Sequence, residues 1–394
     1  MEYQSKNART DRTARFPRGR LTVIGAFVAG TLVASAIAAN AATGGQIMST
    51  FTAAPAADQS SVHATAGKPA TKSTTPAVKS TVGDSMPAMA TGDAGADNSA
   101  MVDPSYRPSA HPTTPTPRVA FLTVINPADP TFNQLLGIND GGRVAGYFGS
   151  GADAAHPNKG YQVRSDYDRD DFTNENVPGS AQTQVVGIND LGTTVGFSVD
   201  GNGANAGFVL RHNTFTPVVN PAGTASPRFD QLLGVNNQGT AAGFYNDANG
   251  ASHGYLYQIQ TRRFTPVILP VHADSVVATG INDRGDISGF FTVGKVTSAF
   301  LIRNHHVTVV NLGGRTNTQA LGIDNNDQIV GSFVDGNGNM HGFVRSNGGV
   351  KQIDDPHAKG GTVVNGINNR NQLVGFYVDA AGNTDGFIAR LIRS

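Results

Sequence analysis

The chain contains no cysteine, which excludes disulfide bonds, thiolate metal sites, a cysteine nucleophile and a lipid-modified N-terminal cysteine. Glutamate is nearly absent, since Glu2 and Glu175 are its only occurrences. Strong helix formers are correspondingly scarce in the C-terminal part, whereas glycine, with 48 residues, and other turn formers are abundant. This composition favours an all-β fold.

The sequence also lacks an excess of basic residues beyond its first 41 positions. Six cations and two anions fall in residues 1–41, which leaves 23 basic and 27 acidic residues in the remainder. A mildly acidic chain without a basic stripe is poorly suited to phosphate backbones. We therefore expect no nucleic-acid partner.

Long apolar runs are missing except for one near the N-terminus. Residues 1–20 are polar and net basic, residues 21–38 form an uncharged run of 18, and Ala39-Asn40-Ala41 follows. This is the order of a secretory signal peptide in residues 1–41. The run is also just long enough to span a bilayer, so an uncleaved signal anchor stays open as the alternative. Both alternatives predict export to a periplasmic, extracellular or cell-surface location, with membrane contact only through residues 21–38 if they are retained.

Residues 42–117 have few large apolar side chains and consist mostly of Ala, Thr, Ser, Pro, Gly and Asp. Such a segment cannot offset the entropy of ordering its backbone. We predict a disordered tether, stiffened locally by proline. A Thr-rich stalk that carries sugars is the alternative. The remaining residues, 118–394, form the predicted folded domain.

What the chain does have is a short phrase, Gly-Ile-Asn-Asp or a close relative, that occurs six times in this domain. The copies are spaced 42 to 50 residues apart and begin at Gly137, Gly187, Gly234, Gly280, Gly322 and Gly366. A period in this range is typical of repeat architectures, in which each unit buries its apolar face against the next one.

Each repeat contains four strand-like runs. In the copy from Phe264 to Arg303, these runs cover residues 264–269, 276–281, 286–291 and 299–303. In every copy a glycine stands in the third run, and an aromatic residue preceded by a small one opens the fourth. Runs such as 373–378 are apolar on both faces, which is typical of strands covered on both sides.

We therefore predict a six-bladed β-propeller with four antiparallel strands in each blade. The links within a unit are short and suit hairpins, whereas the link into each Gly-Ile-Asn strand is long, as in residues 220–231. The strand at 120–125 would then be the outer strand of the last blade and close the ring. An open β-solenoid is the rival fold, although its coils usually have shorter periods.

The units resemble the HAF repeats of bacterial extracellular proteins, a family whose name spells a His-Ala-Phe triplet. The resemblance rests on Gly-Ile-Asn-Asp-x-Gly, then Val-Val-Gly, then His-Gly/Ala-Phe, and it covers residues 118–394. Two of the six copies keep the histidine, at His253 and His341. The resemblance implies export and a propeller-like β fold, and it implies no established activity.

The Asx residues of the repeated phrase have two interpretations. A ring of their oxygens could hold a hard cation such as Ca²⁺. Asn and Asp also form tight turns by bonding to their own backbone. We favour structural turns and expect no cofactor, with Ca²⁺ left as an open possibility. The predicted turn residues are Asn139, Asn189, Asn236, Asn282, Asp324 and Asn368.

Other motifs in the repeats are weak. The loop that starts at Asp335 begins like an EF-hand but has Met340 at the sixth position and Ser346 at the twelfth, instead of Gly and Glu. The one G-x-S-x-G match, around Ser252, precedes a strand rather than a helix. The histidines lack the helical i, i+4 spacing of a zinc site.

Three hypotheses about function follow. The first is a non-catalytic binding module, a monomer that recognises an envelope component, a polysaccharide or a protein. The second is a hydrolase or lyase with its site in the axial channel, and the third is a structural envelope protein. The predicted binding residues lie in the long inter-blade links and are Arg228, Asp230, His272, Asp274 and His357.

Overall fold

The computed structural model describes residues 118–392, except for residues 311, 313, 314 and 348. The predicted signal segment, residues 1–41, and the predicted tether, residues 42–117, lie outside the described residues. No helix in the described part of the chain has the length and hydrophobicity needed to cross a membrane.

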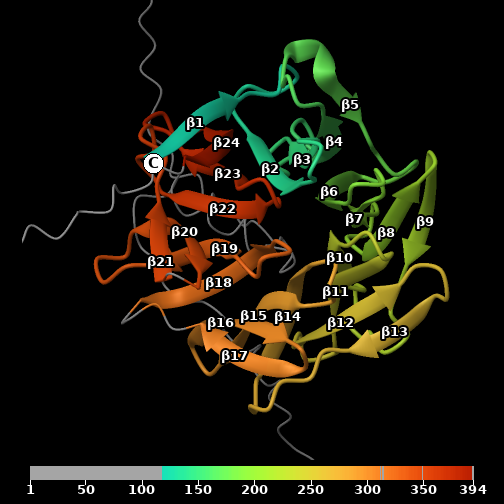
Figure 1. Ribbon diagram of the computed structural model, residues 1–394. Coiled ribbons are helices and arrows are strands. Elements are labelled where there is room, and N and C mark those ends of the chain that lie inside the picture. Colours follow the sequence, from blue (N-terminus) through green and yellow to red (C-terminus); the bar gives the residue numbers. More distant parts are fainter. Residues whose placement is uncertain (1–117, 311, 313–314, 348, 393–394) are drawn as a thin grey trace, which may run out of the picture. The chain divides into compact units, whose positions relative to one another are not determined.

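Six antiparallel sheets of four strands each surround a common axis (Figure 1), which confirms the predicted six-bladed propeller. The strands of each blade are given from the inner to the outer one. Blade 1 consists of β2 (Asn133–Ile138), β3 (Val144–Phe148), β4 (Lys159–Val163) and β5 (Phe172–Asn174), and blade 2 consists of β6 (Gln182–Ile188), β7 (Thr194–Val199), β8 (Asn205–Arg211) and β9 (Thr214–Val218). Blade 3 consists of β10 (Asp230–Val235), β11 (Thr240–Asn246), β12 (Ser252–Gln258) and β13 (Arg263–Pro266).

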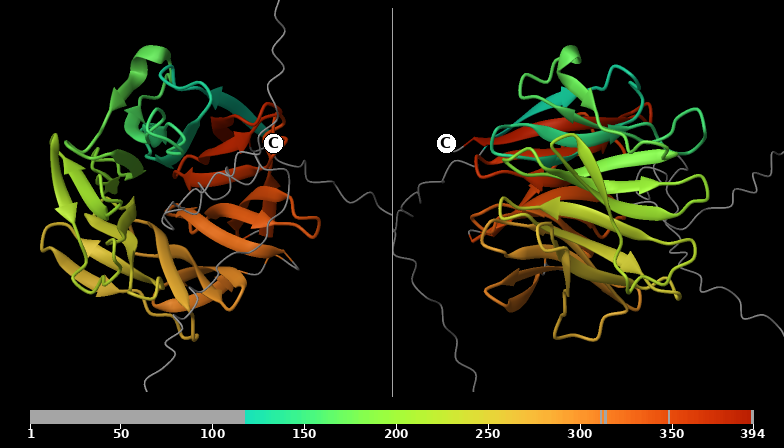
Figure 2. Two further views of the ribbon diagram at one scale, coloured as in Figure 1. Left: turned by 180° about the vertical axis from the view of Figure 1, so that it is seen from behind. Right: turned by 90° about the vertical axis from the view of Figure 1, so that its right-hand side faces the viewer.

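Blades 4 to 6 follow the same order. Blade 4 consists of β14 (Ser275–Ile281), β15 (Ile287–Val293), β16 (Val296–Arg303) and β17 (His306–Val310), and blade 5 consists of β18 (Thr316–Ile323), β19 (Ile329–Val334), β20 (Met340–Ser346) and β21 (Gly349–Ile353). Blade 6 consists of β22 (Thr362–Ile367), β23 (Gln372–Val378), β24 (Thr384–Ile392) and β1 (Arg118–Val124). A 3-10 turn, η1 (Arg169–Asp171), precedes β5. The side view in Figure 2 shows neighbouring sheets packed face to face around the ring.

The ring is closed by the first strand of the domain. Strand β1 pairs antiparallel with β24, from Arg118 opposite Ile392 to Val124 opposite Gly386. In Figure 1 this strand lies beside the last strands of the chain. The predicted outer strand of the last blade is therefore confirmed, and an open solenoid with two free ends is excluded.

The glycine in the second strand of every blade leaves room for an aromatic ring. Gly146 lies opposite Tyr161, and a Cβ on Gly146 would come within 2.9 Å of the Tyr161 ring and overlap the carbonyl oxygen of Gln134. The same cross-strand pairing recurs as Gly196–Phe208, Gly243–Tyr255, Gly289–Phe300, Gly331–Phe343 and Gly375–Phe387. Glycine is thus required for packing, which offsets its low strand propensity.

A second set of glycines brings the inner strands together around the axis. A Cβ on Gly234 would lie 2.8 Å from the carbonyl oxygen of Thr279 and 3.1 Å from the Cα of Gly280 in the next blade. A Cβ on any of the six glycines of the repeated phrase would lie 3.0 to 3.4 Å from the Cα of the next one around the ring, with Gly366 facing Gly137. A register shift precedes each of them, so one extra residue bulges beside every glycine.

The asparagine directly after five of the six inner strands links its blade to the next. Asn139 Nδ2 donates to the carbonyl oxygen of Asn189, and Asn189 Nδ2 donates to that of Asn236. Asn236, Asn282 and Asn368 repeat the contact, at 2.9 to 3.1 Å. Asp324 breaks this ring because a carboxylate has no N–H to donate, and its Oδ2 accepts from Gln328 Nε2 instead.

The next residue of each turn forms a complete second ring. The backbone N–H of Asp140 donates to Asp190 Oδ1 at 2.7 Å, and the same bond joins each blade to the next until Asn369 donates to Asp140 Oδ1 at 2.9 Å. The four intervening bonds run from Asp190, Asn237, Asp283 and Asn325. The turns therefore hold the blades together at one end of the axis.

The interrupted asparagine ring gives a first prediction. In Asp324→Asn, the new amide should donate to the carbonyl oxygen of Asn368 and raise the free energy of unfolding by about 1 kcal/mol. Gln328 can turn to accept from it, as Gln372 accepts from Asn368 Nδ2 at 2.9 Å. Chemical denaturation measures the change. The reciprocal variant Asn236→Asp should destabilise by a similar amount, and a stabilised Asn236→Asp would contradict this role for the amides.

Candidate functional site: the axial cavity and the inter-blade links

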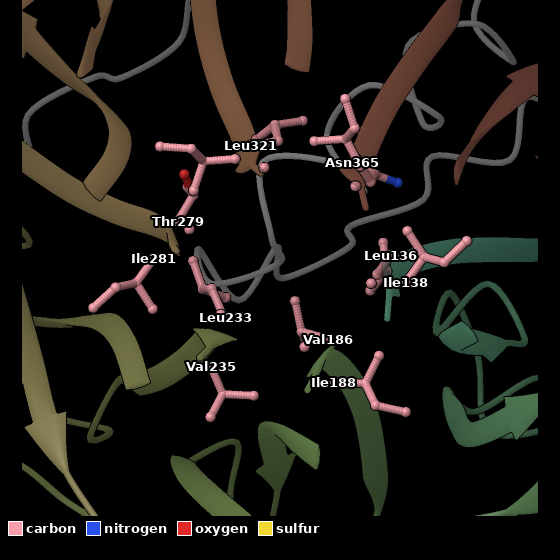
Figure 3. Close-up of a pocket in the computed structure, with 18 of the residues that line it drawn as sticks. Leu136, Ile138, Val186, Ile188, Leu233, Val235, Thr279, Ile281, Leu321 and Asn365 are labelled. Atoms are coloured by element: carbon pink, nitrogen blue, oxygen red, sulfur yellow. The ribbon is translucent and has the colours of Figure 1, made fainter. Parts of the chain in front are cut away.

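A cavity of about 120 Å³ lies on the propeller axis. The inner strands of all six blades wall it, together with Phe244 and Phe290 from the second strands of blades 3 and 4. In Figure 3 the labelled side chains, such as Val186, Leu233 and Leu136, come from different blades and surround the axis. The cavity is therefore formed by the repeat itself, one share from each blade.

Two rings of side chains line this cavity. The first ring consists of the six bulge residues, which are Leu136, Val186, Leu233, Thr279, Leu321 and Asn365. The second ring consists of the residues directly after the glycines, which are Ile138, Ile188, Val235, Ile281, Ile323 and Ile367. The bulge exposes its residue to the axis, because neighbours on the same strands pack between blades instead. Leu135 and Leu232 have no exposed surface, whereas Leu136 and Leu233 keep 5% and 8%.

The two polar members of the lining are committed to other blades. The Thr279 hydroxyl lies 2.8 Å from the carbonyl oxygen of Ala320 and 3.1 Å from that of Ser288. Asn365 Nδ2 donates to the carbonyl oxygen of Leu135 at 2.9 Å. The lining consequently presents an aliphatic wall in which polar groups serve to join the blades.

Glutamines stand two residues before the bulge in four inner strands, at Gln134, Gln184, Gln231 and Gln319. Gln134 Oε1 accepts from the Tyr147 hydroxyl, and Gln184 Nε2 donates to Asn158 Oδ1. Each glutamine nevertheless leaves one buried amide atom without a hydrogen-bond partner. Buried amides of this kind are places where bound water completes the hydrogen bonding.

A second hollow, of about 400 Å³, lies on the outer rim of blades 1 and 2. Its walls include Pro178, Thr214 and Pro217, which are themselves exposed, so it is a depression of the surface. The axial cavity is lined by all six blades, whereas the hollow is confined to one blade junction, so the axial cavity is the better candidate for a binding site.

The five predicted binding residues all lie on or beside links between blades, at the end of the ring opposite the Asx turns. Arg228 and Asp230 stand between blades 2 and 3, His272 and Asp274 between blades 3 and 4, and His357 between blades 5 and 6. Arg228, His272, Asp274 and His357 are exposed, whereas Asp230 is buried. No described hydrogen bond or ion pair joins the three groups, so the structure does not bring them together as one site.

Asp230 holds a link in place. Its Oδ1 accepts from the Tyr255 hydroxyl at 2.6 Å, and its Oδ2 accepts from the backbone N–H of Asn220 at 2.5 Å. Burial raises the pKa of this carboxyl to about 6, against the opposing effects of these two hydrogen bonds and of the Arg228 charge. Asn133 occupies the same repeat position in blade 1 and accepts from the Tyr161 hydroxyl.

The raised pKa of Asp230 makes stability depend on pH. A carboxyl whose pKa is higher in the folded state favours folding at low pH, and this contribution is lost as pH rises from about 4 to about 6, up to about 3 kcal/mol. The difference in unfolding free energy between wild type and Asp230→Asn should therefore change across this window. Denaturation at a series of pH values measures it. Asn133→Asp should introduce a similar dependence, and parallel profiles for wild type and Asp230→Asn would contradict the assignment.

Four of the eight described histidines, His156 among them, have carboxylate partners that sequence reasoning missed. His253 Nε2 lies 2.9 Å from Asp247 Oδ2, and His357 Nδ1 lies 3.0 Å from Asp355 Oδ1. His341 lies between two carboxylates, 3.0 Å from Asp354 Oδ2 and 3.4 Å from Asp335 Oδ2. The repeat spacing offered a signal, because an Asp stands six residues before the histidine in both copies that keep it.

The weak motifs can also be placed. The Ser252 hydroxyl donates to Asn246 Oδ1 at 2.9 Å, so it is bonded to an amide rather than to a general base. Asp335 Oδ1 accepts the backbone N–H groups of Asn337 and Asn339, which is turn geometry, and the contacts from Asn339 lower the pKa of Asp335 to about 2. Within the described ranges, no group of three or more His, Asp or Glu side chains is arranged to hold a metal ion.

No protein-family model matches the sequence, and no curated protein matches it either. Solved structures of similar fold include virginiamycin B lyase from Staphylococcus aureus (11% identity, TM-score 0.37, 70% of this chain and 100% of that chain). They also include a lectin from Aleuria aurantia bound to α-methyl-L-fucoside (12% identity, TM-score 0.41, 69% of this chain and 91% of that chain). A third is the β-propeller domain of the Trilobed protease from Pyrococcus furiosus (10% identity, TM-score 0.39, 65% of this chain and 95% of that chain). At these identities the likeness concerns the propeller fold alone.

Proposed function

We propose that this chain is an exported protein with HAF-type repeats whose propeller acts as a non-catalytic binding module of the bacterial envelope. The signal-like residues 1–41 support export, and the repeat phrase supports the family. The observation that carries the binding function is the axial cavity, which six blades build in common and line with aliphatic side chains.

Binding accounts for this lining better than catalysis does. A hydrolase or lyase needs a general base, a nucleophile or an electrostatic stabiliser at the reacting atoms. Among the described residues that line the cavity, no side chain is titratable, and Thr279 and Asn365 are bonded to neighbouring blades. The candidate residues on the links are divided among three blade junctions, which supports surface recognition rather than one reaction centre.

The test uses the full chain. Cell fractionation should find the protein outside the cytoplasm, and the purified protein should bind an envelope fraction, polysaccharide or protein, saturably and without consuming it. Calorimetry measures the binding, and chromatography of the ligand before and after incubation measures turnover. Catalytic turnover of the bound polysaccharide, or retention of the protein in the cytoplasm, would refute the proposal.

A further inference from the structure

The axial cavity has a size that selects its occupant. Its volume of about 120 Å³ is close to that of apolar cavities, about 150 Å³, that remain dry and take up benzene or xenon. It is much smaller than the pockets of about 300–1,000 Å³ that enclose whole drug-sized ligands. A ligand of this cavity is therefore a small molecule or one end of a larger one.

The chemistry of the wall selects the occupant further. Ten of the twelve residues in the two lining rings are Leu, Ile or Val. The other two, Thr279 and Asn365, use their polar groups to bond to Ala320 and Leu135 of the neighbouring blades. Most side chains of the wall therefore offer an occupant apolar contacts and no hydrogen bond, which favours an apolar group over a charged one.

The backbone keeps the cavity open. Neighbouring inner strands approach closely at the glycines, because a Cβ on Gly187 would lie 3.0 Å from the Cα of Gly234 and 2.8 Å from the carbonyl oxygen of Leu233. Inner strands fixed by such contacts, and by the two rings of Asx hydrogen bonds beyond them, cannot move inward to fill the space. The axis-facing side chains accordingly retain some exposed surface, such as 8% for both Val186 and Leu233.

From these observations we infer that the axial cavity binds a small alkyl or aryl group of a hydrophobic ligand. The inference deepens the proposed binding function by naming the chemical class that the ligand presents to the axis. Binding removes apolar surface from water on both partners, and the fixed wall loses little conformational entropy in the process.

The experiment uses benzene and xenon as probes of the full-length protein. Benzene binding is measured by calorimetry and xenon binding by NMR, in wild type and in Val186→Phe, which should fill the cavity with its own ring. We expect one saturable site in wild type and a loss of affinity of about tenfold or more in the filled variant. Leu191→Phe, at an exposed turn position, is the matched control and should bind like wild type.

Absence of saturable probe binding to the folded wild type would overturn the inference, and so would undiminished binding by a folded Val186→Phe. If Val186→Phe does not fold, Val186→Leu is used, and it should weaken benzene binding by about threefold. Leu233→Ala enlarges the cavity and should admit a bulkier aromatic probe. Turnover of an envelope ligand would refute the proposed function without affecting the probe result, so the two failures are distinguishable.

Discussion

Deletion of residues 118–124 should abolish cooperative folding of the whole propeller, not just of its last blade. Strand β1 supplies the seven residue pairs with β24 that close the ring. It also buries Val124 and packs Phe121 against Phe387 with 5.4 Å between the ring centroids. We expect a loss comparable to the stability of an ordinary domain, about 5–15 kcal/mol. Thermal unfolding followed by circular dichroism measures it.

Hydrogen exchange distinguishes global from local loss. In a closed ring, exchange should accelerate in blade 3, which lies across the axis from blade 6, as well as in the blades beside the deletion. Deletion of the exposed loop residues 152–155 is the control and should leave one sharp transition. Protection that is retained in blade 3, with fraying confined to blades 6 and 1, would show that the blades behave as an open array.

The propeller could be predicted from the sequence because its determinants are local and repeated. A period of 42 to 50 residues, four strand-like runs and apolar residues on both faces specify a blade covered by its neighbours. Ring closure followed because strand 120–125 had no partner elsewhere in that scheme. The cross-strand pairs, such as Gly375 with Phe387, explain why glycine and an aromatic residue recur together.

The contacts between blades could not be predicted, because they join residues about one repeat apart. Asn189 suits its own turn, since its Oδ1 accepts the backbone N–H of Thr193 at 2.9 Å, and an Asp would do this equally well. The amide is needed for the bond to the carbonyl oxygen of Asn236 in the next blade. The preference for Asn over Asp in five of six copies was the available signal.

The axial cavity was hidden for a different reason. Simple alternation along an inner strand assigns side chains to two faces, but the bulge before each glycine turns one residue toward the axis. Leu135 and Leu136 are adjacent leucines in the sequence, but Leu135 is fully buried between blades whereas Leu136 lines the axial cavity. The charged residues of the links drew more notice in the sequence, yet one of them, Asp230, is buried and fixes the Asn220 link.

Replacing Gly331 with alanine should be among the most destabilising single substitutions in the domain. Gly331 lies in the middle of β19, opposite Phe343 in β20. A Cβ there would overlap the carbonyl oxygen of Gln319 in β18 and lie 3.0 Å from Phe343 Cε1. Both neighbours are held in the sheet, and the Phe343 ring is fully buried, so neither can give way at low cost. We expect a loss of about 3 kcal/mol or more.

Thermal unfolding measures this loss, which corresponds to a fall in Tm of about 5 °C for a domain of this size. Gly336→Ala in the turn after β19 is the matched control, because a Cβ at that position meets no atom within 4 Å. The control should stay within about 0.5 kcal/mol of wild type, as surface substitutions usually do. If Gly331→Ala proved equally mild, the strands would have room for a methyl group beside the aromatic ring, and glycine would recur there for a reason other than packing.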